Sequence, residues 1–277
     1  LHWLAGISLG FATGVKWSGL YYFVAFFAFM VYADYRQRQA QEDPNPIRST
    51  IRFSLLKRAL QYGVAPVITY LISWTGWFLT GSGWDRTWSK NIVRNFWHYH
   101  AEILNFHTNL VEKHSYSANP WSWLVMGRPT SFFYATPKGC ASTSCSQEVL
   151  ALGTPFLWWS GVVAIAVTFG YWIARREWQS GLLLLGIAAG YLPWFTFQKR
   201  TMFSFYAIAF EPFMILVIAY LISKFLDRDG SVKLRKQLVI AYICAIVLCF
   251  IYFSPLYFGG VLTYSEWIHR MWFPSWI

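Results

Sequence analysis

Long apolar stretches recur along the chain and alternate with short segments that carry most of the charges. The stretches cover Leu1–Gly14, Trp17–Ala33, Leu60–Thr80, Phe156–Ala174, Gly181–Phe197, Phe203–Phe225 and Leu238–Phe258. An apolar run of about 17 residues or more can cross a hydrocarbon core of about 30 Å as a helix. Lipid offers the backbone no hydrogen-bond partners, so such stretches cross it as helices. The pattern therefore predicts an all-α polytopic membrane protein, in which the first stretch is short for a complete span.

Basic residues collect in every second connection between these stretches. Ala33–Leu60, Ala174–Gly181 and Phe225–Leu238 are rich in Lys and Arg, which is typical of cytoplasmic loops. The other connections, among them Gly81–Gly153, and the C-terminal tail are then expected on the outer side. This interpretation divides the chain into membrane helices with a basic cytoplasmic loop (residues 1–80), an extracytoplasmic loop (81–153), four membrane helices (154–258) and an extracytoplasmic tail (259–277).

Gly81–Gly153 is the only large segment outside the predicted spans, and it shows few alternating strand patterns and no obvious core. In its first part, apolar residues recur at spacings of three and four, at Trp84, Trp88, Ile92, Phe96, Tyr99, Ile103, Phe106 and Leu110. The opposite face carries Arg86, Lys90, Arg94 and Glu102. This one-sided pattern predicts an amphipathic helix that lies on the membrane surface or against other membrane helices.

The composition agrees with a membrane protein. Hydrophobic residues make up 56% of the chain and charged residues only 13%, whereas a typical soluble domain carries about 25% charged residues. The 17 Trp and 17 Tyr residues suit a protein with two membrane–water boundaries. We attribute the net charge of +11 to basic loops that contact anionic lipid head groups. Nucleic acid is not an expected partner, because no binding motif accompanies the charge.

Cysteines and histidines in the outer loop invite a chemical interpretation. Cys140 and Cys145 could form a disulfide in an oxidising compartment, or they could remain free thiols. The loop also holds four histidines, His98, His100, His107 and His114. The last three are spaced seven apart, too far along a helix to share one ion, and no His-Glu-x-x-His pattern occurs. We expect no metal site here, and assign the histidines to interfacial hydrogen bonds or to contact with a polar substrate.

Three charged residues lie within or at the ends of apolar stretches, where a charge is costly unless it meets water or a partner. Lys16 and Arg200 lie at the predicted outer ends of different spans. Each either anchors its helix at the interface or holds a lipid phosphate, for which the planar fork of Arg is well suited. Glu211 interrupts the sixth stretch beside Pro212, which can kink a helix. This carboxylate is either a structural partner or a functional group.

Several segments match, in order, the sequence patterns of one enzyme family. The run from Gly6 to Leu20 (GISLGFATGVKWSGL) resembles the G-x-x-x-G-x-x-x-x-x-K-W-x-G-L stretch of protein O-mannosyltransferases. Further similarities occur at Asn105–Leu110, His114–Trp123, Gly127–Phe133, Gly153–Trp159, Leu192–Phe195 and Arg200–Tyr206. The segment Gly139–Cys145 is similar to the actinobacterial branch. The resemblance covers nearly the whole chain.

The resemblance implies a multi-pass glycosyltransferase of the GT-C type in the plasma membrane. Such enzymes transfer mannose from a polyprenyl-phosphate carrier to Ser or Thr hydroxyls of exported proteins, with inversion at the sugar carbon. The implied partners are the lipid-linked donor, secreted or membrane protein acceptors, membrane lipids and the protein export translocon. The resemblance implies no cofactor besides the donor substrate.

The family's general base belongs to an Asp-Glu pair in the first outer loop. This sequence has no such pair, because Glu42-Asp43 has the reverse order and lies on the predicted cytoplasmic side. We therefore expect the base on a segment upstream of Leu1, and expect residues 1–277 alone to be inactive. The resemblance assigns Lys16, Arg200 and Tyr206 to the carrier phosphate. It assigns to the acceptor or sugar site the loop residues His107, His114, Trp121 and Arg128.

Two other interpretations stay open at this point. A GT-C aminosugar transferase would share the architecture but would act on a glycolipid. A non-enzymatic transporter or lipid-binding protein would explain the many spans and the missing base. An inverted repeat would favour the transporter, and none is visible in the sequence.

Overall fold

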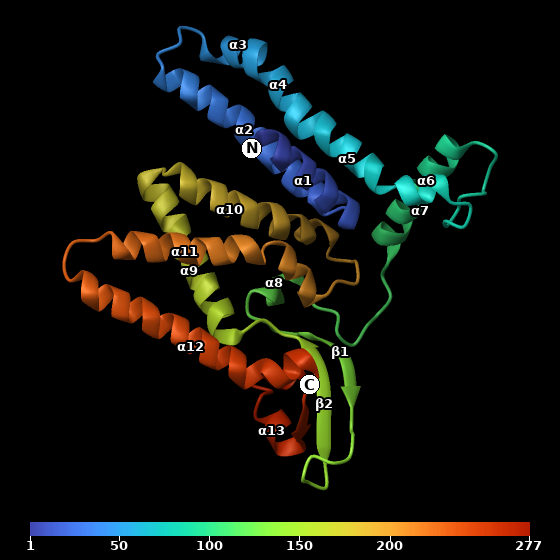
Figure 1. Ribbon diagram of the computed structural model, residues 1–277, viewed down its shortest axis with the longest axis vertical. Helices are drawn as coiled ribbons and strands as arrows, with labels where there is room; N and C mark the ends of the chain where they lie inside the picture. Colours follow the sequence, from blue (N-terminus) through green and yellow to red (C-terminus); the bar gives the residue numbers. More distant parts are fainter. The chain divides into compact units, whose positions relative to one another are not determined.

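The computed structural model describes all 277 residues and contains two compact units, Leu1–Leu110 and Val111–Ile277, which are described separately (Figure 1). The chain is mainly helical, as the apolar pattern predicted. Three helical segments are long and apolar enough to cross a membrane by length and composition. They are α9 (Pro155–Arg175), α10 (Trp178–Tyr191) with the 3-10 turns of η3 (Leu192–Phe197), and α12 (Val232–Phe258).

The first unit consists of helices alone. They are α1 (His2–Val15), α2 (Gly19–Ala40), α3 (Pro46–Thr50), α4 (Leu56–Ala59), α5 (Ala65–Ser73), α6 (Thr75–Leu79) and α7 (Ile92–Asn109). Two π-helical turns, η1 (Ile51–Leu55) and η2 (Leu60–Val64), join α3, α4 and α5. The junction residues keep right-handed helical backbone, so α3 to α5 follow one another without a loop.

Glycines let α1 approach η2 and α5 closely. A Cβ atom at Gly6 would lie 1.8 Å from the backbone oxygen of Gln61, and one at Gly10 would lie 2.5 Å from that of Pro66. Small residues at such spacings allow membrane helices to pack backbone against backbone. The glycines of the G-x-x-x-G stretch therefore form the packing face of α1.

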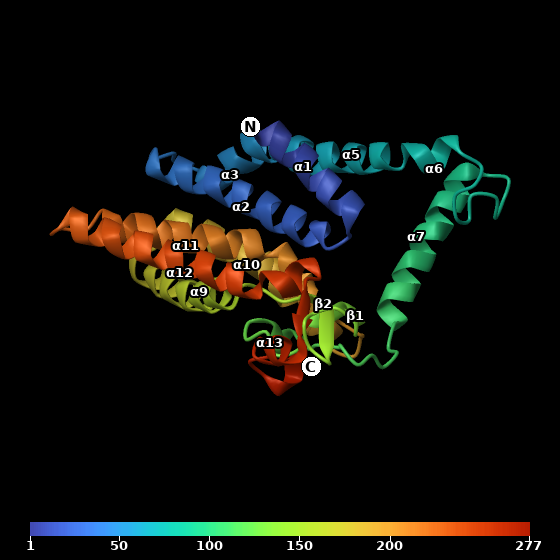
Figure 2. The ribbon, with the colours of Figure 1, turned by 60° about the horizontal axis from the view of Figure 1, so that its bottom comes forward.

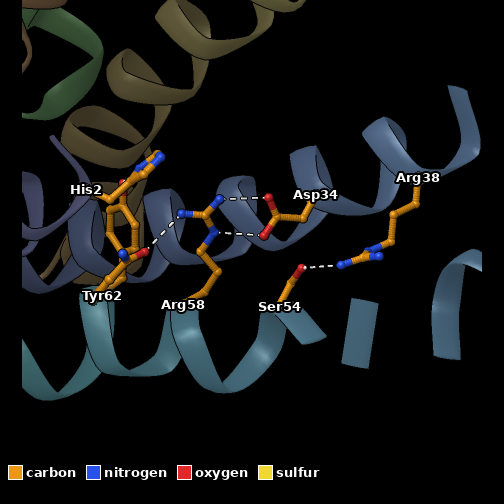
Figure 3. A network of polar contacts seen from close by, with 7 residues as sticks. His2, Asp34, Arg38, Ser54, Arg58 and Tyr62 are labelled. Atoms are coloured by element: carbon orange, nitrogen blue, oxygen red, sulfur yellow. Dashed lines mark hydrogen bonds and ion pairs between the residues drawn. The ribbon is translucent and has the colours of Figure 1, made fainter. Parts of the chain in front are cut away.

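A buried ion pair joins α2 to α4 (Figure 3). The Arg58 guanidinium donates two hydrogen bonds to the Asp34 carboxylate, at 2.7 and 2.8 Å, and a third to Gln61 Oε1 at 2.9 Å. Farther along, Arg38 donates to Ser54 Oγ at 3.2 Å. Arg58 is only 8% exposed, and a charge so placed is tolerated because its donors are paired.

This pairing explains why the predicted loop Ala33–Leu60 is largely helical. Helix α2 continues to Ala40 and α3 begins at Pro46, so only residues 41–45 lie outside helices. Hydropathy marks where a helix leaves apolar surroundings, whereas Arg and Gln continue a helix readily. The basic residues thus belong to helix ends rather than to an irregular loop.

The second unit packs helices α9, α10, α11 (Glu211–Leu226) and α12 together (Figure 2). Its core includes Phe210, Met214, Val217 and Phe253, which have no exposed surface. Short elements complete the unit: α8 (Pro120–Trp123), η4 (Ser204–Ala209), α13 (Tyr264–Ile268) and η5 (Pro274–Trp276).

The sixth apolar stretch is divided between η4 and α11. Pro212 lies in the first turn of α11, where its missing N–H costs the helix no hydrogen bond. The residue therefore helps to start a helix and does not kink one, which corrects the expected role of the Glu211-Pro212 pair.

A small antiparallel sheet in this unit was not part of the predicted all-α class. Strands β1 (Thr130–Ala135), β2 (Cys145–Ala151) and β3 (Val261–Thr263) pair in the order β1-β2-β3. The buried positions of the middle strand alternate from Ser146 through Glu148 to Leu150, but two of these three residues are polar. The strand therefore lacks the apolar–polar alternation in sequence that identifies a half-buried strand, so its pattern gave no signal.

The amphipathic helix of the predicted outer loop begins later than the apolar stripe indicated. Helix α7 starts at Ile92, because the Asn91 side chain accepts hydrogen bonds from the N–H groups of Val93 and Arg94 and so caps the helix. Trp88, which extended the stripe, lies in the preceding turns and stacks on His98 with ring centroids 3.9 Å apart. Trp88 therefore fits the helical spacing in the sequence, although it packs against α7 from outside the helix.

Cys140 and Cys145 are linked by a disulfide. The bond closes the connection between β1 and β2 at the start of β2. Cys244 and Cys249 on α12 are free thiols.

The glycine face of α1 yields a direct test. Gly6→Ala should lower the free energy of unfolding by about 1–3 kcal/mol, the usual cost of overpacking, because the new methyl group overlaps the Gln61 backbone. Gly63→Ala is the matched control, since no atom lies within 4 Å of its added Cβ. Thermal unfolding of the full-length protein in detergent measures both. Equal stability of the two variants would contradict the close packing of α1.

Candidate functional site

Arg200 lies in the short connection between η3 and η4, among aromatic side chains. The guanidinium carbon is 5.9 Å from the ring centroid of Trp194 and 5.9 Å from that of Tyr206. Trp194 is buried, and its indole N–H donates to the Gly190 carbonyl at 3.0 Å. The two rings are themselves 4.8 Å apart. Aromatic faces attract the guanidinium, so this arrangement holds Arg200 in place while its N–H fork keeps the geometry that suits phosphate.

A second segment of the same unit is bound to this connection. Thr201 Oγ1 donates to the Glu112 carbonyl, and the Ala118 N–H donates to the Met202 carbonyl at 2.7 Å. These bonds fix residues 112–118 beside residues 201–202. The two segments lie far apart in the sequence, so no local pattern predicted this contact.

His114 therefore lies close to the Arg200 connection. Its ring meets Phe203 edge to face at a centroid distance of 5.0 Å, and its Nδ1 accepts the Tyr116 N–H at 3.1 Å. The ring of Phe203 is in turn 6.1 Å from that of Tyr206. Of the residues selected from the sequence, the second unit thus brings together His114, Arg200 and Tyr206.

Arg128 and Trp121 occupy other surroundings. Arg128 donates from Nε to the Ser115 carbonyl at 3.1 Å and from Nη1 to the Ser275 carbonyl at 2.6 Å, and it stacks over Tyr116. It thereby joins the segment around Ser115 to the C-terminal tail. Trp121, on α8, is 69% exposed and meets Phe195 edge to face at 4.5 Å.

The other selected residues belong to the first unit. Lys16 follows the last residue of α1 in extended conformation and is exposed. Its neighbour Trp17 donates from the indole N–H to Tyr70 Oη at 3.1 Å. His107 lies near the end of α7, exposed, with its ring 5.2 Å from Phe106.

Tyr70 connects Trp17 to His100, a residue that the sequence had not marked out from the other histidines. His100 Nδ1 lies 2.8 Å from the Phe96 carbonyl, which can only accept, so Nδ1 carries the proton. Nε2 of the neutral ring then accepts the Tyr70 O–H at 2.6 Å. Burial lowers the pKa of the His100 imidazole below 6.5, and the Phe96 bond opposes this only in part. A signal for this role was absent, because Tyr70 on α5 and Trp17 in the turn after α1 lie far from His100 in the sequence.

Trp17, Tyr70 and His100 form one wall of an apolar cavity of about 430 Å³ in the first unit. The other lining residues include Leu20, Phe23, Val67, Trp97 and Leu104. Besides the hydrogen-bonded row from Trp17 to His100, Thr13 is the one polar residue of the lining, so the cavity suits a hydrocarbon chain. No group of three or more His, Cys, Asp or Glu side chains is arranged to hold a metal ion.

Comparison with known proteins identifies the class first. The chain resembles one chain of the Saccharomyces cerevisiae protein O-mannosyltransferase Pmt1–Pmt2 complex, solved with bound sugar donor, with a TM-score of 0.57 and 23% identity. The match covers 68% of this chain and 27% of that one. This likeness shows the fold, a multi-span membrane fold of the glycosyltransferase type, and confirms the predicted fold class.

The family follows from the sequence. Residues 92–276 match the family described as the C-terminal four TMM region of protein-O-mannosyltransferase. Polyprenol-phosphate-mannose–protein mannosyltransferases of Mycobacterium tuberculosis and Corynebacterium glutamicum are each 31% identical over 98% of this chain. This chain belongs to the protein O-mannosyltransferase family, which confirms the resemblance seen in its motifs. It spans about half the length of these relatives, 56% of each.

The hydrogen-bonded row predicts a specific effect of one hydroxyl group. Tyr70→Phe should destabilise the protein by about 0.5–1.5 kcal/mol, the usual net value of a hydrogen bond. Tyr99→Phe is the control, because Tyr99 packs on Trp74 through its ring only. Stability should also fall as the pH drops below about 6.5, since the unfolded chain then binds a proton that the buried His100 ring resists.

Both effects are measured by melting temperatures of the full-length protein between about pH 8 and about pH 5, a range that spans the ordinary pKa of His. His100→Gln should reduce the slope with pH. An unchanged slope in His100→Gln, or equal losses in the two Tyr variants, would contradict the assignment.

Proposed function

We propose that this chain is the C-terminal membrane part of an enzyme that transfers mannose from a polyprenyl-phosphate carrier to Ser or Thr hydroxyls of exported proteins. The proposal is supported by the names of the actinobacterial relatives and by one feature of the second unit. That feature is Arg200, held against Trp194 and Tyr206 at an apolar helix end. A cation in this place suits an anionic lipid head group, and a carrier phosphate is the anion that the reaction supplies.

The role of Arg200 follows from the charge that develops in the reaction. As the bond between mannose and phosphate breaks, negative charge grows on the phosphate that leaves. A guanidinium already fixed in position stabilises that charge more strongly in the transition state than in the bound substrate. Tyr206 keeps the guanidinium oriented through its ring. The arginine thus lowers the barrier, and does more than anchor the lipid.

The first unit supplies a second cation and an apolar cavity. The family resemblance assigns Lys16, which is exposed after the end of α1, to the phosphate of a lipid carrier as well. Trp17, the next residue, lines the cavity of about 430 Å³, which accommodates part of the prenyl chain. Lys16 and Trp17 are adjacent in the sequence. A cation for the charged head group of the carrier therefore lies next to an apolar wall for its prenyl chain.

The acceptor hydroxyl loses its proton to a carboxylate that lies outside these residues, in the family's Asp-Glu pair. For the sugar or acceptor site we keep His114, Trp121 and Arg128 of the second unit and, separately, His107 of the first. No resident cofactor or metal takes part in this scheme. The enzyme acts in the plasma membrane on proteins that emerge from the export translocon.

Substitution of the two cations in the full-length enzyme tests the proposal. Arg200→Ala should reduce mannose transfer about 10²–10³-fold, by analogy with the loss of one oxyanion-hole donor. Arg200→Lys should restore only part of the rate, because the charge returns without the planar fork. Lys16→Ala should act in the same direction. Transfer from polyprenyl-phosphate-mannose to a Ser/Thr-containing peptide is the measured quantity.

Arg94→Ala serves as the matched control, because Arg94 also stacks on an aromatic ring, that of Trp88 at 5.0 Å, but has no assigned role. Its transfer rate should stay near that of the unchanged enzyme. Near-normal transfer by correctly inserted Arg200→Ala and Lys16→Ala variants would show both cations to be interfacial anchors and would refute the assignment.

A further inference from the structure

Strand β1 forms one edge of the three-stranded sheet. The strand order β1-β2-β3 gives β1 a single partner, so the hydrogen-bonding side away from β2 pairs with no other strand of this unit (Figure 1). Residues of β2 are mostly buried, whereas β1 exposes three aromatic side chains in succession. Phe132 is 61% exposed, and Phe133 and Tyr134 are each 45% exposed.

This edge carries only one of the usual protections against added strands. Proteins commonly block an exposed edge with Lys, Pro, a β-bulge or a very short strand. Thr130–Ala135 contains neither Lys nor Pro and runs for six residues, interrupted only by a bulge at Phe132. The opposite edge, β3, has three residues and passes directly into α13. Only β1 therefore offers a strand-length template.

The sheet is also held firmly enough to act as a template. The Cys140–Cys145 disulfide closes the hairpin connection. Gln147 on β2 donates to the Gly259 carbonyl at 2.7 Å, which ties the sheet to the end of α12. Glu148 accepts the Trp267 indole N–H at 2.7 Å and is buried. A preorganised edge loses little entropy when a partner strand is added.

Aromatic contacts link this edge to the Arg200 connection. The ring of Phe132 lies 5.4 Å from that of Phe205, and Phe205 lies 4.9 Å from Tyr206. Tyr206 is the ring on which Arg200 stacks. A chain bound along β1 would thus run a few side chains away from the cation that our proposed function assigns to the carrier phosphate.

We propose that the edge of β1 binds the acceptor polypeptide, which adds to the sheet as an extended strand. This inference rests on the proposed function and names how its acceptor is recognised. Main-chain hydrogen bonds supply affinity in strand addition, and the exposed aromatic side chains contact the peptide's side chains. Recognition through the backbone accepts many sequences but requires an extended segment. The enzyme therefore takes unfolded stretches that carry Ser or Thr hydroxyls, and excludes folded domains.

N-methylated acceptor peptides test this on the unaltered full-length enzyme. Successive amides of an extended chain point to opposite sides, so only every second amide can pair with β1. Two peptides of one sequence are needed, with N-methyl groups at the odd or at the even positions flanking the acceptor residue. One of the two methylated peptides should have an acceptor KM about tenfold or more above that of the unmodified peptide, because its methyl groups block the amides that pair with β1. The acceptor KM of the other peptide should stay within about twofold of the unmodified value.

The outcomes separate this inference from the proposed function. Absence of mannose transfer to the unmodified peptide would refute the function itself. Normal transfer with equal effects of both methylation patterns would refute strand addition and leave the function intact. Slow hydrogen exchange of the β1 amides on the outer side, before any peptide is added, would also overturn the proposal, because the edge would then already be paired.

A pair of variants tests the edge from the side of the protein. Phe132→Ala should raise KM for the acceptor several-fold, about the loss of one aromatic contact, with little change in KM for the donor. Phe258→Ala is the control, because Phe258 is 76% exposed but lies at the end of α12. Equal acceptor KM values for both variants would count against binding at β1.

Discussion

The need to satisfy backbone hydrogen bonds in apolar surroundings decides where this chain can be irregular. Lipid provides no partners, so departures from helix belong at the ends of spans or inside protein. The second unit follows this constraint between η3 and η4. There the chain leaves helical geometry, and the Met202 carbonyl accepts the N–H of Ala118, while Thr201 Oγ1 donates to the Glu112 carbonyl. These two bonds hold residues 112–118 beside the Arg200 connection, so backbone groups decide which segment lies next to it.

Charges obey a related constraint in the first unit. Arg58 is buried, and three of its hydrogen-bond donors are occupied by Asp34 and Gln61. Arg200 instead relies partly on ring faces, which attract a cation without using its N–H groups. The first arrangement joins α2 to α4, whereas the second places a guanidinium against the rings of Trp194 and Tyr206. Two arginines of one chain are therefore positioned by different kinds of partner.

The sequence predicts the features that depend on local pattern and misses those that depend on distant partners. Apolar run length identified the helices α9, α10 and α12, and the Lys16-Trp17 and Arg200–Tyr206 motifs indicated the family. The hairpin was missed because β2 buries the polar residues Ser146 and Glu148 and β1 exposes consecutive aromatic residues. The role of His100 was missed because Trp17 and Tyr70 lie far away in the sequence. The start of α7 was misplaced because Trp88 packs on His98 from a turn.

The disulfide has a consequence for how the hairpin depends on the rest of the unit. Its two cysteines are five residues apart, so the ring they close is made from a single local stretch. Forming this bond needs no contact with α9 to α12. A short ring removes less freedom from the unfolded chain than a long one, so the bond constrains the connection between β1 and β2 and leaves the packing of the helices to other contacts.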